Sequence, residues 1–149
     1  MGTMQTKQII ARVLISIAFA INVMCAIQFL VWPDTYVPLY SLTGDGARAA
    51  IQGFGVCFLM WNATYPPVIA HPHRYRVLFG VVIAQQLIGL VGESIILLGV
   101  DPATALFSSV LRFIVFDAAN LVLLIIAFML TRQKETQANS KAQSSRRPS

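Results

Sequence analysis

Residues 104–130, TALFSSVLRFIVFDAANLVLLIIAFML, form a long apolar stretch that also contains Arg112, Asp117 and Asn120. A helix that crosses a bilayer needs about 20 mostly apolar residues. The stretch therefore predicts a transmembrane helix. Because a charge is costly inside a bilayer, we expect its polar side chains to face the interior of a helix bundle rather than lipid.

Three further stretches of the chain have the same character. Hydrophobic residues make up 56% of the 149 residues, charged residues only 11%, and the mean hydropathy is +0.69. That composition is too apolar for a soluble domain of this size. We predict an all-α fold, a four-transmembrane-helix bundle in a single domain of residues 1–131, with spans at 9–31, 47–67, 77–98 and 104–130. Residues 132–149 are polar and without periodicity, and they predict a disordered basic tail.

Local chemistry marks the breaks between these spans. Pro33 ends the first span, because proline disfavours helix in the residue before it. The second span is the weakest, since Gln52, Asn62 and the pair Pro66–Pro67 dilute it. Trp61 and Asn62 lie deeper than interface residues should. They either line an interior cavity or mark a helix that ends earlier.

Charged residues favour one orientation. Basic residues gather before the first span, between the second and third, and after the fourth: Lys7, Arg12, Arg74, Arg76 and those of the tail. The other side carries three aspartates and one arginine: Asp34, Asp45, Asp101 and Arg48. The positive-inside rule then places both termini in the cytoplasm of a multi-pass cell-membrane protein. The net charge of +5 favours contact with anionic lipid headgroups over nucleic acid. Trp32 suits the outer interface, and Tyr65 and Tyr75 the inner one.

Glu93, Arg112 and Asp117 are the charged residues that lie well inside the predicted spans, away from their ends. Glu93 lies about five residues from the outer end of its span and Arg112 about eight, which corresponds to depths of roughly 8 and 12 Å. The two can form an ion pair, which is either a functional feature or a lock between the third and fourth helices. Asp117 lies deeper, and its nearest cation is Arg112, about one and a half turns away. It is either protonated or shares Arg112 with Glu93, and it is the residue that most favours a functional role.

Amide side chains lie at similar depths in all four spans. Gln86 precedes Glu93 by seven residues and Asn120 follows Asp117 by three, so each pair shares a helix face. We therefore predict a polar pocket in the outer half of the bundle, and its candidate residues are Glu93, Arg112, Asp117, Asn22, Gln52, Gln86 and Asn120. The alternative for the amides is structural, because polar side chains also join membrane helices at about 0.6 kcal/mol for each hydrogen bond.

Small residues predict close contacts between helices. Ala49, Gly53 and Cys57 repeat every four residues, and Gly89 and Gly92 lie on the third span. Such spacing lets two membrane helices approach closely.

Four short motifs give the chain a resemblance to a known family. They are FLVWP at 29–33, IQGFGVCFLM at 51–60, GLVGES at 89–94 and RFIVFDAANL at 112–121. With four spans and internal termini, the chain resembles the DoxX-like small membrane proteins. That resemblance implies a four-helix membrane fold, and some members associate with redox or quinone-linked systems. Sterol-isomerase-like membrane enzymes have a related architecture, in which intramembrane acids line a lipid pocket.

Three functional hypotheses follow. The first is an intramembrane polar pocket that binds a lipophilic or amphiphilic molecule. The alternatives are a non-catalytic subunit or scaffold of a membrane complex, and an isomerase-like enzyme in which Glu93 and Asp117 act as acid and base. Neither a metal-ligand motif nor a cofactor or nucleotide signature is present, so we expect no cofactor. The expected partners are the lipid bilayer, a lipophilic ligand, and a membrane protein partner or a second copy of the chain.

Overall fold

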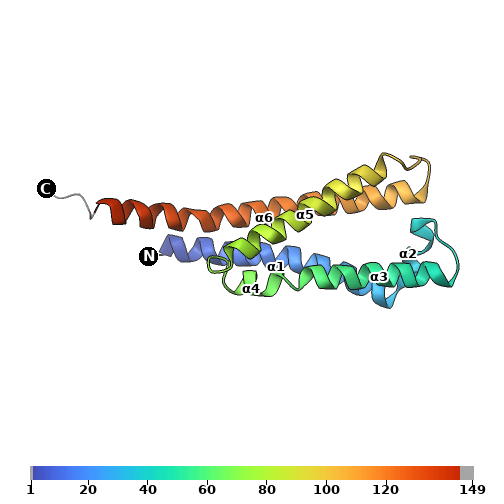
Figure 1. Cartoon of the computed structure of the whole chain (residues 1–149), viewed down its shortest axis with the longest axis horizontal. Helices are drawn as coiled ribbons and strands as arrows, with labels where there is room; N and C mark the ends of the chain where they lie inside the picture. Colours follow the sequence, from blue (N-terminus) through green and yellow to red (C-terminus); the bar gives the residue numbers. More distant parts are fainter. Residues whose placement is uncertain (1, 145–149) are drawn as a thin grey trace.

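The computed structural model describes residues 5–44 and 46–131, and every regular element in that part of the chain is helical. The predicted disordered basic tail, residues 132–149, lies outside the described residues. In chain order the elements are α1 (Gly2–Val31), α2 (Pro33–Tyr36), the 3-10 helix η1 (Pro38–Tyr40), α3 (Asp45–Asn62), α4 (Tyr65–Ala70), α5 (Arg76–Leu97) and α6 (Ala105–Ser144) (Figure 1).

Three of these helices are long and apolar enough to cross a membrane. They are Gln5–Val31 within α1, Arg76–Leu97, and Ala105–Thr131 within α6. Their positions agree with the spans predicted at 9–31, 77–98 and 104–130. Length and composition therefore support three membrane-spanning helices directly.

The second predicted span, 47–67, is not a single helix. α3 ends at Asn62, two residues form a turn, and α4 begins at Tyr65 with prolines in its first turn. Proline lacks the N–H that an unbroken helix would need, but it fits the first turn of a new helix. The helix therefore ends at Asn62, earlier than the predicted end at residue 67, and Trp61 also lines a cavity, so the two interpretations of Trp61 and Asn62 do not exclude each other.

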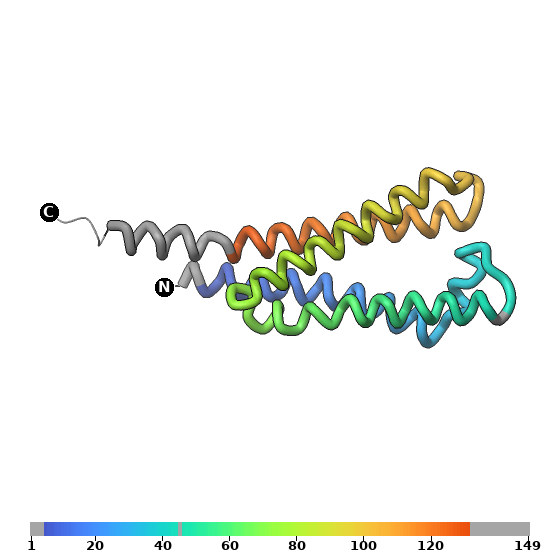
Figure 2. The backbone as a smooth tube through the Cα atoms, viewed as in Figure 1, coloured from blue at the N-terminus to red at the C-terminus, as the bar shows by residue number. Residues whose placement is uncertain are grey.

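The long helices form two pairs that lean against each other. α1 packs on α3, α5 packs on α6, and α1 also packs on α6. Figure 2 shows the pairs close together near the chain termini and further apart at the opposite end. We call the first of these the terminal end and the second, which carries α2 and η1, the distal end. α3 and α5 do not pack along their lengths, and Figure 2 shows their backbones apart at the distal end.

A closed apolar core fills the terminal end. Its fully buried members come from α1, α4, α5 and α6: Ala11, Ile15, Ala18, Tyr65, Val68, Phe79, Val82, Leu124 and Ala127. The Phe79 and Phe128 rings meet edge to face with centroids 5.3 Å apart. This core fixes the helices at one end and leaves the distal end free to hold cavities.

The outer surface of the bundle is more apolar than parts of its interior. Val77 is 87% exposed and Leu98 is 88% exposed, whereas Gln86 is 1% exposed and Asn120 2%. A water-soluble protein normally buries its aliphatic side chains and exposes its amides. The reversed arrangement is the one that a lipid environment favours.

Close packing of α3 on α1 involves a different stripe from the predicted one. Ala49, Gly53 and Cys57 point outward, and the buried face is Ala47, Ile51 and Gly55. The predicted stripe is therefore wrong, because α3 is rotated so that another face meets α1. Small residues occur on both faces of α3, so composition alone did not determine which face meets α1. A Cβ added at Gly55 would lie 2.9 Å from the backbone oxygen of Ala26 and 2.8 Å from Leu30 Cγ.

Gly55→Ala should therefore destabilise the fold by about 1–3 kcal/mol, because the added methyl group meets backbone that cannot move aside. Thermal unfolding in mild detergent would measure this change. Gly53→Ala is the matched control, since nothing lies within 4 Å of a Cβ at that position. Equal melting temperatures for the two variants would contradict the close contact of α1 with α3.

Candidate functional site

A layer of hydrogen-bonded polar side chains lies between the apolar core and the distal end. Asn120 Nδ2 donates to Asn22 Oδ1 at 3.1 Å, and Asn22 Nδ2 lies 3.4 Å from Gln86 Oε1 and 3.3 Å from the Tyr65 hydroxyl. The Tyr65 hydroxyl also lies 3.5 Å from Gln86 Oε1. We call Asn22, Tyr65, Gln86 and Asn120 the amide layer. It joins α1, α4, α5 and α6 at one level.

The amide layer brings together three of the residues predicted for the pocket, and it corrects another prediction. Asn22, Gln86 and Asn120 converge, as their depths indicated. Tyr65 was predicted at the inner membrane interface, but it is 0% exposed and belongs to this layer. Because the break before α4 turns its first residue into the bundle, Tyr65 reaches the amides instead of a headgroup. Gln52 is not part of the layer, since its Nε2 donates to the Leu30 carbonyl at 3.2 Å.

A cavity of about 270 Å³ lies on the distal side of the amide layer, between α1, α6 and the segment that contains α2 and η1. Its polar wall residues include Arg112, Asp117 and Asn120 on α6 and Asn22 on α1. We call this space the polar cavity. Exposed Met24 and Phe116 also line it, so it opens to the outer surface of the bundle.

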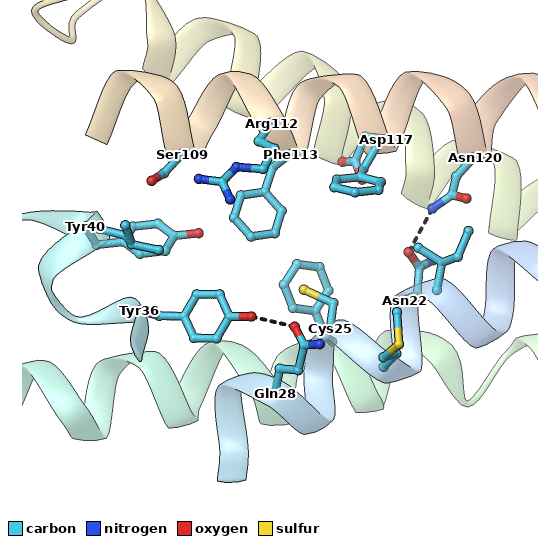
Figure 3. Close-up of a pocket in the computed structure, with 15 residues that line it drawn as sticks. Asn22, Cys25, Gln28, Tyr36, Tyr40, Ser109, Arg112, Phe113, Asp117 and Asn120 are labelled. Atoms are coloured by element: carbon cyan, nitrogen blue, oxygen red, sulfur yellow. Dashed lines mark hydrogen bonds between the residues drawn. The ribbon is translucent and has the colours of Figure 1, made fainter. Parts of the chain in front are cut away.

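Two tyrosines from the segment between α1 and α3 close the distal side of the polar cavity. Pro33 begins α2 and Pro38 begins η1, and each short helix carries one of the tyrosines. The Tyr36 hydroxyl donates to Gln28 Oε1 (Figure 3). Burial raises the pKa of Tyr36 and of Tyr40, so both hydroxyls keep their protons at neutral pH.

The prediction from sequence did not include Tyr36 and Tyr40. The available signal was the repeated proline in WPDTYVPLY, residues 32–40, which favours two short turns over an extended loop. Such turns fold the segment back over the bundle, and η1 packs on α6. In Figure 3 the Tyr40 hydroxyl and the Arg112 guanidinium point into the same part of the cavity.

The predicted ion pair between Glu93 and Arg112 is absent from the described residues, where the one carboxylate–guanidinium bridge is the exposed Arg48–Asp34 pair at 3.3 Å. Arg112 lines the polar cavity, whereas Glu93 lines a second cavity on the far side of Phe113. The depths of the two residues were similar, but the rotation of each helix points their side chains into different spaces.

The Asp117 carboxylate packs closely against Gly89. A Cβ added at Gly89 would lie 2.8 Å from Asp117 Oδ2 and 3.0 Å from Trp61 Cη2. The missing side chain therefore leaves room for a carboxylate from α6 and an indole from α3 against the same turn of α5. Gly92, which was predicted to pack in the same way, has nothing within 4 Å of a Cβ.

The site contains polar groups for binding but no centre for metal chemistry. Among residues 5–44 and 46–131, no three His, Cys, Asp or Glu side chains lie close enough together to hold a metal ion. The polar cavity instead offers a guanidinium, a carboxylate, amides and hydroxyls beside apolar walls. That combination suits a molecule with a polar head and an apolar body.

Comparison with known protein families, with characterised proteins and with solved structures finds no match to this chain.

Asn120→Leu should lower the free energy of unfolding by about 0.6–1.7 kcal/mol, because it leaves Asn22 Oδ1 without its donor inside the bundle. Chemical or thermal unfolding in detergent would measure the loss. Ser108→Ala is the control on the same helix, since Ser108 is exposed and donates to the carbonyl of Ala105 in its own helix. A loss no greater than that of Ser108→Ala would contradict a structural amide layer.

A double-mutant cycle on Glu93→Gln and Arg112→Gln should give a coupling energy below about 0.5 kcal/mol, because residues that do not touch are additive. The stability of the two single variants and the double variant supplies the measurement. The cycle on Asn22→Leu and Asn120→Leu is the positive control, since those two side chains share a hydrogen bond. A coupling energy between Glu93 and Arg112 larger than in this control would show that the two side chains form an ion pair after all.

Proposed function

We propose that the chain is a small multi-pass membrane protein that binds an amphiphilic small molecule in the polar cavity. The observation that carries the proposal is the wall of that cavity. Arg112 is a cation with no ion pair in the described part of the chain, and it lies beside apolar side chains that reach the outer surface. A guanidinium offers five donors and no acceptor, so it favours a polar head with acceptor oxygens.

The route into the polar cavity supports a lipophilic ligand. Met24 on α1 and Phe116 on α6 line the cavity and are exposed on the outer surface. In a bilayer that surface faces lipid, so a molecule dissolved in the membrane reaches the cavity from the side. Its head then meets Arg112 and Tyr40, while its apolar part stays near the rim. In this arrangement the polar head of the ligand lies toward the distal end of the bundle, and the apolar part of the ligand lies toward the hydrocarbon of the bilayer.

The proposal includes the placement of the chain in the membrane. Three spans follow from length and composition. We place α3 and α4 together as the fourth crossing, because α3 packs on α1 along the same axis and α4 continues it to the terminal end. The basic residues at the terminal end then place both termini in the cytoplasm and the distal end outside. The DoxX-like resemblance belongs to the same proposal and is consistent with this arrangement.

Native mass spectrometry of the protein in nanodiscs tests the binding function. We expect the wild-type chain to carry a reproducible bound small molecule, and Arg112→Gln to lower its occupancy about tenfold or more, because a hydrogen bond to a charged group is lost. Arg48→Gln is the matched control, since Arg48 is exposed, as Arg112 also is, but lies outside the wall of the cavity.

Two outcomes would contradict the proposed function. Equal occupancy in Arg112→Gln and Arg48→Gln would show that the retained molecule does not depend on the polar cavity. A clean protein mass, or a stoichiometric protein partner without a small molecule, would favour a scaffold of a membrane complex. The occupancy of the bound molecule in Asp117→Asn is a second test, because Asp117 lies in the same wall of the polar cavity.

A further inference from the structure

A second cavity of about 380 Å³ lies beside the polar cavity, and its walls are mostly aromatic. We call it the aromatic cavity. Six rings line it, from α1, η1, α3 and α6: Phe29, Tyr40, Phe54, Phe58, Trp61 and Phe113. Glu93 is the one charged residue in its wall. Because Tyr40, Phe58 and Phe113 line both cavities, these three rings separate the two spaces.

Two polar atoms in the wall of the aromatic cavity lack partners. Trp61 Nε1 and Glu93 Oε2 are buried, and neither forms a hydrogen bond within the described residues. A buried polar group without a partner costs about 1–3 kcal/mol, and such groups are rare in native structures. One is a donor and the other an acceptor, and they come from helices that do not pack along their lengths, α3 and α5. A molecule that bound between those helices and reached both atoms would supply the missing partners.

The aromatic cavity opens to the outer surface along the gap between α3 and α5. Phe54 on α3 and Ile96 on α5 both line it and are exposed. Figure 2 shows the two helices diverging from the middle of the bundle to the distal end. Trp61 on α3 lies against Gly89 on α5, so the two helices are in contact at this level. A lipid-soluble molecule can therefore enter from the side without crossing the polar cavity.

The two unpartnered atoms distinguish between classes of polar head. A carboxylate head would accept from Trp61 but would face the carboxyl group of Glu93. An amine head would pair with Glu93, and the aromatic rings would favour its charge, but it would leave the Trp61 N–H without an acceptor. A hydroxyl both accepts and donates, so it can serve Trp61 and Glu93 together.

We propose that the aromatic cavity is a second binding site, which takes a lipophilic alcohol or phenol from the membrane. Its hydroxyl accepts a hydrogen bond from Trp61 Nε1–H and donates one to Glu93 Oε2, while its apolar body lies among the aromatic rings. The inference uses the membrane placement proposed above. It does not depend on ligand binding in the polar cavity.

The fluorescence of Trp61 tests this site directly. The chain has two tryptophans, and Trp32 is exposed, so Trp32→Phe leaves Trp61 as the single reporter. Nanodiscs containing this variant are titrated with a dibrominated long-chain alcohol, since bromine quenches an indole on contact. The dibrominated alkane and amine of the same chain length are titrated in parallel. We expect saturable quenching by the alcohol, and only the gradual quenching of simple partitioning by the other two.

Variants of the same parent separate binding from folding. Glu93→Met keeps the length of the side chain and removes both oxygens. It should weaken alcohol binding about tenfold or more without lowering the melting temperature, because Oε2 has no partner in the free protein. Arg112→Met removes the cation of the polar cavity and should leave the quenching curve of the alcohol unchanged. If Arg112→Met loses the molecule bound in the polar cavity but keeps alcohol binding, the result therefore bears on the proposed function and not on the aromatic cavity.

Three results would overturn the second site. The first is a quenching curve for the alcohol that matches the curve for the alkane. The second is saturable quenching by the amine, which would assign the aromatic rings and Glu93 to a cation. The third is a lower melting temperature of Glu93→Met with unchanged alcohol binding, which would show that Glu93 has a structural partner. The comparison of the three probes needs no Glu93 variant, so it decides the question even if that variant does not fold.

Discussion

The hydrogen bonds of the amide layer constrain everything else in this small bundle. Asn22, Gln86 and Asn120 would each be costly against lipid, and they become acceptable only by facing one another and Tyr65. Their convergence fixes the rotation of α1, α5 and α6 about their axes. With that rotation set, the apolar core closes on one side of the layer, and the cavities lie on the other. Arg112 and Asp117 line the polar cavity because they share a helix with Asn120.

The open distal end results from a contrast in packing between the two helix pairs. Gly55 lets α3 approach the backbone of α1, whereas α3 meets α5 where the Trp61 indole lies against Gly89, and these two helices do not pack along their lengths. Aromatic side chains from α1, α3, η1 and α6 partly fill the resulting space and divide it in two. Each cavity then has its own opening and its own chemistry. One presents a guanidinium and a carboxylate, whereas the other presents an indole N–H and a carboxyl group among rings.

Sequence alone predicted the elements that depend on composition. Apolar length located α1, α5 and α6, and depth along the helices brought Asn22, Gln86 and Asn120 to one level. The predictions that failed depend on the rotation of a helix about its axis. Hydrophobic periodicity does not determine that rotation when both faces of the helix are apolar. Glu93 and Arg112 were at similar depths but face different cavities, and the stripe that meets α1 contains Gly55 instead of Gly53. Tyr65 was misplaced because the proline-marked break before it redirects the chain.

The connectivity of the amide layer also determines the order in which the protein can be assembled during synthesis. Asn22 and Asn120 are 98 positions apart, so their hydrogen bond can form only after α6 has been made. α1 and α3 are neighbours in sequence and can pair early, and α5 and α6 form the second pair. A single amide in an apolar helix is a modest cost, so α1 can insert before its partner exists. Both cavities have walls from the two pairs, so neither cavity is complete before the pairs dock.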